Sequence, residues 1–319
     1  MNRDKILAYI TGVGVTVGVA GAAMSPVAHA DDPLAGSDTA IILGGTTEPT
    51  PSTAFAQAAE NLFLNPLGFD DGATGSTVCD MVGTDPCAAP LQVLTTPELI
   101  QQGPSSFTAA DDLTLAVENE FNADPGAFDA EHPLTIFGYS QSATAESIAM
   151  SQLEAYGIPS DDLHFVFIGD PSLPGGVWPN IVADMDSVLG ASLTNTLLTD
   201  FGIDGVLGNE TPTDLYPATI YSLDGDGVAD FQQDFEEGGL LQTIEGLFVN
   251  HVEYLGLTPE QVADATTTTN GDLTLVDISD ADVNNFDAWI SAVFEHGAAG
   301  SGLLESVINS LDLFLTNSF

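Results

Sequence analysis

The chain has 319 residues, of which 44% are hydrophobic, 47 are acidic and only two are Lys or Arg, so its formal net charge at pH 7 is −45. This hydrophobic content is ample for a packed core and excludes a disordered chain. A surface with so large an excess of negative charge repels phosphate backbones and anionic headgroups, which excludes ordinary nucleic-acid binding and electrostatic docking to acidic membranes.

The N-terminus has the form of a cleaved export signal. Arg3 and Lys5 precede an apolar stretch at residues 10–23, and the Ala-His-Ala sequence at residues 28–30 has the small-x-small form of a signal-peptidase site. The alternative is an uncleaved membrane anchor, but the apolar stretch is shorter than the roughly 20 residues that a spanning helix needs. We therefore predict a signal peptide at residues 1–30 and a protein that is secreted or held at the cell envelope.

The first half of the remaining chain alternates short apolar runs with helical patterns. The predicted strands are residues 38–43, 91–94, 133–137 and 164–168, and the predicted helices are residues 54–64, 107–121 and 143–156. Such alternation predicts βαβ units, and hence an α/β fold with a mostly parallel central sheet flanked by helices on both faces.

The second half of the chain is less regular. Gly- and Pro-containing segments flank a helical stretch at residues 181–199, so residues 174–213 are typical of a lid-like insertion or binding loop. A further strand is predicted at residues 218–222, and the chain from 226 to 319 is predicted to be mainly helical. Without an internal repeat, we expect a single domain over residues 31–319.

Two cysteines, Cys79 and Cys87, lie eight positions apart in a loop that contains Gly and Asp. Export to an oxidising compartment favours a small loop-closing disulfide between them. Because no histidine lies nearby in the sequence, a zinc site is disfavoured and a structural role is expected.

The sequence GYSQS, residues 138–142, falls between a predicted strand and a predicted helix. A serine on such a turn is pushed out at the carboxyl edge of the sheet, where the helix N-terminus and the next amide stabilise negative charge. Gly138 is small, as the turn requires, and Ser142 stands where glycine is more usual. We predict that Ser140 is a nucleophile and that the Gln141 amide is one oxyanion donor, the alternative being an ordinary helix N-cap serine.

A nucleophilic serine needs a histidine base. His132 and His164 lie at the starts of predicted strands, away from the carboxyl edge, which leaves His251 and His296. His296 is the weaker candidate because it lies in an apparently regular helix. His251 is therefore the predicted base.

The acid of a triad in this fold class comes between the serine and the histidine, on the loop after a late strand. Asp226 meets both conditions, since it follows the strand at 218–222 and precedes His251 by 25 residues. Asp230 is the alternative, but it lies further from the strand end.

The same loop also resembles a calcium site, because Asp224, Asp226 and Asp230 follow a D-x-D-G-x-x-D pattern. A full calcium loop also needs a ligand at its fifth position and a bidentate acid at its twelfth, and these positions hold Val228 and Phe235. We therefore favour the triad acid and keep calcium binding as an alternative.

A second oxyanion donor is needed from the loop after the first strand, where Gly44 and Gly45 let the backbone approach a substrate closely. With this loop, the motifs of the chain are IILGGT, IFGYSQSA, FIGDPSLPGG, DGVADF and VNHVEY. In this order they resemble the PE-PPE domain family of actinobacterial serine hydrolases, which is similar to cutinases, over most of residues 38–256.

The resemblance implies an α/β-hydrolase fold, esterase activity on acyl esters, and a triad of Ser140, Asp226 and His251. It also maps the oxyanion donor of the first loop to Thr46. The sequence departs from the family pattern in three ways. The predicted signal leads directly into the hydrolase-type domain, so we expect a stand-alone form without a PE or PPE module, and Gln232 occupies the place of an expected proline. An arginine usual after the GDP-like turn is also missing, which bears on substrate preference.

Together these features predict a secreted serine carboxylic-ester hydrolase, esterase- or lipase-like, that forms an acyl-enzyme with an acyl ester or lipid substrate and needs no cofactor and no metal. One alternative is an acyltransferase that uses the same triad on cell-envelope glycolipids such as trehalose esters. Another is a non-catalytic secreted calcium-binding protein in which Ser140 only caps a helix.

Overall fold

A computed structural model describes residues 33–279, apart from residues 124–125, 127, 201 and 204. The predicted signal peptide at residues 1–30, the helices expected beyond residue 280, and His296 lie outside the described residues. Within the described part of the chain, no helix combines the length and apolar character needed to cross a membrane.

An eight-stranded sheet forms the centre of the molecule. Its strands are β1 (Ala40–Ile42), β2 (Val78–Asp80), β3 (Leu91–Val93), β4 (Leu134–Tyr139), β5 (Leu163–Ile168), β6 (Ala218–Leu223), β7 (Thr266–Asn270) and β8 (Leu273–Ile278). They lie in the order β2-β3-β1-β4-β5-β6-β8-β7, and every neighbouring pair is parallel except β7 and β8. The carboxyl ends of β1, β3, β4, β5 and β6 therefore meet at one edge, where the loops that follow them come together.

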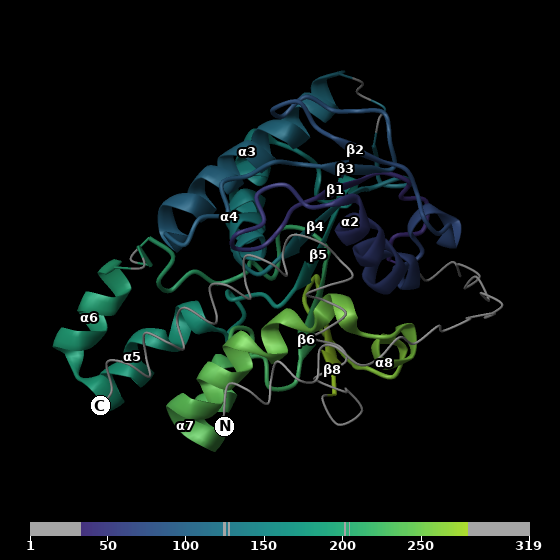
Figure 1. The fold of residues 1–319 in the computed structure, drawn as a ribbon. Helices are drawn as coiled ribbons and strands as arrows, with labels where there is room; N and C mark the ends of the chain where they lie inside the picture. Colours follow the sequence, from purple (N-terminus) through teal and green to yellow (C-terminus); the bar gives the residue numbers. More distant parts are fainter. Residues whose placement is uncertain (1–32, 124–125, 127, 201, 204, 280–319) are drawn as a thin grey trace, which may run out of the picture.

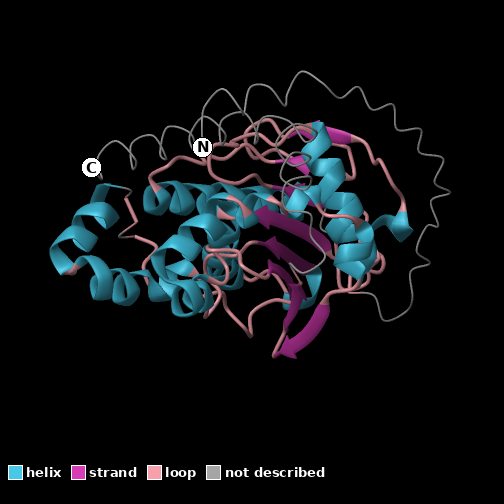
Figure 2. Cartoon of the chain, turned by 60° about the horizontal axis from the view of Figure 1, so that its bottom comes forward, coloured by secondary structure: helices cyan, strands magenta, loops and turns pink. Residues whose placement is uncertain are grey.

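Helices cover both faces of this sheet. They are α2 (Thr53–Ala59), which continues as a π-helical turn over Glu60–Leu64, α3 (Gln102–Ala123), α4 (Gln141–Tyr156), α5 (Val177–Leu189), α6 (Ala191–Asp200), α7 (Phe231–Phe248) and α8 (Pro259–Ala263). Figure 1 shows α3 and α4 on one side of the sheet and α2 and α8 on the other, and the turned view of Figure 2 shows the strands between the helical layers.

The core is divided by the sheet into two apolar clusters, because successive residues of a strand point to opposite faces. In β1, Ile41 packs into the cluster with Leu113 of α3, and Ile42 packs into the cluster with Phe55 of α2. The central strands are buried throughout, as expected for a parallel sheet covered on both faces. These features confirm the predicted α/β-hydrolase fold.

The prediction for the second half missed two strands. Within residues 226–279, α7 and α8 are helical as expected, but Thr266–Asn270 and Leu273–Ile278 form an antiparallel hairpin, and β8 pairs in parallel with β6. The reason is local: a run of β-branched threonines leads into Asn270-Gly271, a pair typical of tight hairpin turns. Gly271 has a φ of +64°, which other residues adopt only with strain.

The insertion contains two helices, α5 and α6, separated at Gly190, where a single helix was expected. Its apolar residues form a third cluster with the start of α7, built from Val177, Trp178, Ile181, Leu198, Ile203, Val206, Val228 and Phe231. The insertion therefore packs directly beside the loop after β6.

Cys79 and Cys87 form the expected disulfide, which ties β2 to the loop that leads into β3. Strand β2 itself has three residues and no sequence pattern that predicted it.

Candidate active site

Ser140 occupies the turn between β4 and α4 and has a φ of +58°, a conformation that is strained for a residue with a side chain. The turn is held by Ser142, whose hydroxyl accepts from the Tyr139 amide (2.8 Å) and donates to the Tyr139 carbonyl (3.1 Å). The serine that replaces the more usual glycine thus stabilises the turn. Gly138 leaves room for the buried Glu146 carboxyl group, which a Cβ at this position would displace.

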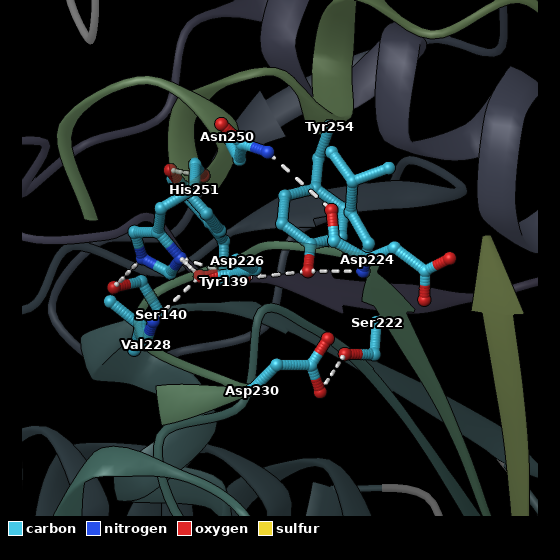
Figure 3. A network of polar contacts seen from close by, with 11 residues as sticks. Tyr139, Ser140, Ser222, Asp224, Asp226, Val228, Asp230, Asn250, His251 and Tyr254 are labelled. Atoms are coloured by element: carbon cyan, nitrogen blue, oxygen red, sulfur yellow. Dashed lines mark hydrogen bonds and ion pairs between the residues drawn. The ribbon is translucent and has the colours of Figure 1, made fainter. Parts of the chain in front are cut away.

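A continuous chain of hydrogen bonds joins three side chains from three separate loops (Figure 3). The Ser140 Oγ lies 2.7 Å from His251 Nε2, and His251 Nδ1 lies 2.8 Å and 3.0 Å from the two carboxylate oxygens of Asp226. Asp226 is fully buried and His251 is 6% exposed. The structure therefore brings together the three predicted triad residues in the geometry that general-base activation of a serine requires.

Asp226 is fixed by two further donors. The Val228 amide donates to Oδ1 at 2.8 Å, and the Tyr254 hydroxyl donates to Oδ2 at 2.7 Å. Tyr254 also accepts from the Leu223 amide at the end of β6 (2.9 Å). These bonds hold the carboxyl group toward His251.

His251 is enclosed by packing as well as by hydrogen bonds. Tyr139 stacks on its ring at a centroid distance of 5.3 Å and donates from its hydroxyl to the His251 carbonyl (2.6 Å). On another side lies Gly169, the first residue after β5, where a Cβ would be 2.8 Å from His251 Cε1 and 3.1 Å from Asp226 Oδ2. A side chain at Gly169 would displace the histidine.

The alternative acid, Asp230, points away from His251 and accepts from the Ser222 hydroxyl (3.2 Å) (Figure 3). Its burial, together with the neighbouring Asp226, raises its pKa to about 8. Asp230 is therefore mainly protonated at pH 7, and Asp226 is the acid that faces His251.

The remaining histidines of the described chain lie elsewhere. His132 is exposed and 3.3 Å from Asp129, whereas His164 is buried in β5 beside Thr219. Burial lowers the pKa of His164 to about 4, so it stays neutral. Across the part of the chain that the structure describes, no group of three or more His, Cys, Asp and Glu side chains is arranged to hold a metal ion.

The two predicted oxyanion residues lie on loops that contact each other. Gln141 is the first residue of α4, and its buried side chain donates to the Leu99 carbonyl (2.8 Å). Thr46 follows β1 and accepts from the Gln102 side chain (3.1 Å). Gly45, beside it, packs so closely on Tyr139 that a Cβ would lie 2.8 Å from the ring.

Sequence reasoning missed the residues that orient the triad: Tyr139, Gly169 and Tyr254. Each lies inside a motif that the sequence analysis recognised: Tyr139 in IFGYSQSA, Gly169 in FIGDPSLPGG and Tyr254 in VNHVEY. An aromatic residue three positions after a candidate base was a visible but weak signal, because its partner Asp226 comes from a distant loop.

Comparison with known proteins gives a family for more than half of the chain: the PE-PPE domain matches residues 88–276. Among curated proteins, the PPE family protein PPE28 of Mycobacterium tuberculosis is 30% identical over 234 residues, which are 72% of this chain and 31% of the relative. Esterase PE16 of the same organism is 27% identical over 235 residues, 72% of this chain and 39% of the relative. The chain thus spans about a third of the length of these curated relatives.

Two solved structures are also similar. A cutinase-like protein from Cryptococcus sp. shares 16% identity and a TM-score of 0.35 over 70% of this chain and 96% of its own. The NocB thioesterase domain from the nocardicin cluster shares 17% identity and a TM-score of 0.32 over 87% of this chain and 96% of its own.

Proposed function

The chain belongs to the PE-PPE domain family, and from this premise we propose that it is a serine esterase or lipase-like hydrolase that cleaves acyl esters. The observation that carries the proposal is the unbroken chain of hydrogen bonds from Ser140 through His251 to Asp226. The name of one relative, Esterase PE16, agrees with this chemistry.

In the proposed reaction, the Ser140 Oγ attacks the ester carbonyl while His251 Nε2 takes its proton. Asp226 keeps the other ring nitrogen, Nδ1, protonated and stabilises the imidazolium that forms. His251 then returns the proton to the leaving alcohol, which leaves an acyl group on Ser140. Water attacks this acyl-enzyme with His251 again as base, and the free acid leaves.

Negative charge develops on the former carbonyl oxygen in both steps. We assign its stabilisation to the backbone amides of Thr46 and Gln141. The Gln141 amide is at the N-terminus of α4, whose helix dipole adds to the effect.

The insertion is proposed to form part of the substrate-binding wall, because its apolar cluster includes Val228, two residues after the triad acid. We further propose export of the protein to an oxidising compartment. The Cys79–Cys87 disulfide supports this part of the proposal.

The test is covalent labelling of the purified protein with a fluorophosphonate probe, followed by hydrolysis of p-nitrophenyl esters of increasing acyl length. Wild type should be labelled on Ser140, and Ser140→Ala and His251→Ala should not be. Because Arg3 and Lys5 are the only basic residues, the labelled peptide must be mapped after cleavage at Glu or at aromatic residues, not with trypsin.

A matched pair of variants separates the two candidate acids. Asp226→Asn should lower kcat by roughly 10³- to 10⁴-fold, the order seen when a triad acid is neutralised. Asp230→Asn, which mimics the protonated side chain, should stay within a few-fold of wild type. Folded wild-type protein that takes up no probe would contradict the proposed function.

A further inference from the structure

Two loops at the candidate oxyanion site carry non-glycine residues in the left-handed backbone region. Thr47, after β1, has a φ of +74°, and Glu98, after β3, has a φ of +41°. A β-branched residue such as threonine is a genuine outlier there, because its side chain crowds the backbone. The Thr47 amide donates to the Glu98 carbonyl at 2.8 Å, so each strained residue braces the other.

The Glu98 loop also contacts both of the residues assigned to the oxyanion site. The next residue, Leu99, accepts from the Gln141 side chain at 2.8 Å. Three positions further on, Gln102 donates to the Thr46 hydroxyl at 3.1 Å. A displacement of this loop would therefore disturb Thr46 and Gln141 together.

The carboxyl group of Glu98 is buried, with 1% of the residue exposed. One oxygen accepts from the Thr96 hydroxyl at 2.8 Å, and the other is buried without a hydrogen-bond partner. Glu48, from the opposing loop, is buried beside it. A protonated carboxyl tolerates this environment, whereas a carboxylate there would be desolvated and repelled.

The titratable groups around Glu98 are themselves acids. Burial raises the pKa of Glu98 to about 8. The hydrogen bond from Thr96 opposes this shift in part, and the neighbouring Glu48 adds to it. Tyr139 faces Glu48 from β4, and burial holds its pKa well above the usual range. The described chain contains no Lys or Arg that could neutralise a second carboxylate.

Building on the proposed esterase activity, we propose that Glu98 is a positioning residue whose neutral carboxyl group keeps the Thr47 and Glu98 loops together and so holds the Thr46 amide at the oxyanion position. Loss of its proton would place a buried charge against Glu48 and push the loops apart. Transition-state stabilisation would then weaken, while binding of the ester, which depends on other contacts, would not change.

The experiment is a pH profile of kcat and KM for wild type and Glu98→Gln between pH 6 and 10, with circular dichroism at each pH. Wild-type kcat should fall roughly 30-fold between pH 7 and 9.5, as the protonated fraction of a group with a pKa near 8 falls, with KM unchanged. Glu98→Gln, a neutral isostere, should keep its pH 7 kcat and lose this alkaline fall. Should that variant not fold, Glu48→Gln decides, because removing the neighbouring negative charge lowers the pKa of Glu98 and must move the fall to lower pH.

Two control variants make the result specific. Glu120→Gln alters another glutamate with a raised pKa, at the far end of α3, and should leave the profile unchanged. Asp230→Asn alters the other acid whose pKa is near 8; if it removes the alkaline fall and Glu98→Gln does not, the proposal is overturned. An alkaline fall that follows loss of the circular dichroism signal also overturns it.

The outcome distinguishes this inference from the function on which it rests. If the wild-type protein does not hydrolyse esters at pH 7, the proposed esterase function is contradicted, and the inference about Glu98 falls with it. Wild type that is active at pH 7 but shows the same alkaline fall as Glu98→Gln overturns the inference alone.

Discussion

Tyr254 shows how one side chain can connect the triad to the sheet. Its hydroxyl donates to Asp226 Oδ2 at 2.7 Å and accepts from the Leu223 amide at 2.9 Å. The bond to Leu223 anchors the tyrosine to the last residue of β6, and the bond to Asp226 turns the carboxylate toward His251. Hydrogen bonds to a carboxylate are charge-assisted and therefore strong. Losing one of these donors should disturb the orientation of Asp226 more than losing a hydrogen bond between neutral groups would.

We expect Tyr254→Phe to lower kcat about tenfold at unchanged KM, as hydrogen bonds to charged groups contribute about 1.5–3 kcal/mol and only part of this affects the reaction. The free energy of unfolding should also fall by about 1–3 kcal/mol, because the Leu223 amide is left buried without a partner. Steady-state kinetics and urea unfolding measure the two effects. Phe63→Leu, a change in the same core cluster away from Asp226, is the control and should change stability without the loss of kcat.

At the scale of elements, the β7–β8 hairpin supports the loop that carries Asp226, the proposed triad acid. Strand β8 pairs with all of β6, and the Ile278 carbonyl accepts from the Asp224 amide just beyond it (2.9 Å). Residues far along the chain thus hold the start of the Asp226 loop. The turn of the hairpin, Asn270-Gly271, packs on the Thr213 carbonyl at the end of the insertion.

The prediction for this hairpin concerns Gly271, where φ is +64° and a Cβ would lie 2.6 Å from the Thr213 oxygen. Gly271→Ala should lower the free energy of unfolding by about 2–3 kcal/mol, from backbone strain and from the close contact. Gly83→Ala is a matched control, because Gly83 has the same φ with nothing within 4 Å, and it should cost only about 1 kcal/mol. Equal losses in the two variants, measured by urea unfolding, would contradict the role assigned to the contact.

For the molecule as a whole, the decisive property is that the acidic side chains of the described residues have no Lys or Arg partner. Arg3 and Lys5 lie outside the described residues, so every buried carboxyl group there must be hydrogen-bonded or protonated. Glu146, fully buried in α4 with neither oxygen hydrogen-bonded, has a pKa raised well above the usual range by burial and by Asp170. Burial likewise raises the pKa of Asp170 to about 6.

This property predicts that the protein is most stable in mildly acidic solution. For each of these groups the folded pKa lies above the unfolded value, so its contribution to stability is complete below the unfolded pKa, near 4, and is lost as the pH rises through the folded pKa. With folded values of about 6 for Asp170 and about 8 for Glu98 and Asp230, the loss extends from about pH 4 to pH 8. Urea midpoints should therefore be higher at pH 5.5 than at pH 8.5, with equal slopes, and equal midpoints would contradict the prediction.

The sequence by itself determined the features that depend on local pattern. Short, continuously apolar runs predicted β1, β3, β4, β5 and β6, because a parallel strand is buried on both of its faces. The GYSQS turn singled out Ser140 because strand, small residues and helix follow one another directly. Chain order then selected Asp226 and His251 as partners, and spacing indicated the Cys79–Cys87 disulfide.

Only the tertiary structure decided what depends on residues that are distant in the chain. The sequence favoured Asp226 over Asp230 only by its shorter distance from the strand end, whereas the structure separates them by their partners, His251 for Asp226 and Ser222 for Asp230. The roles of Tyr254 and Gly169 arise from packing across the carboxyl edge of the sheet, which no periodicity records. The contact of Glu98 with Thr47 likewise joins two loops about fifty residues apart, since adjacent parallel strands bring their ends together regardless of their separation in sequence.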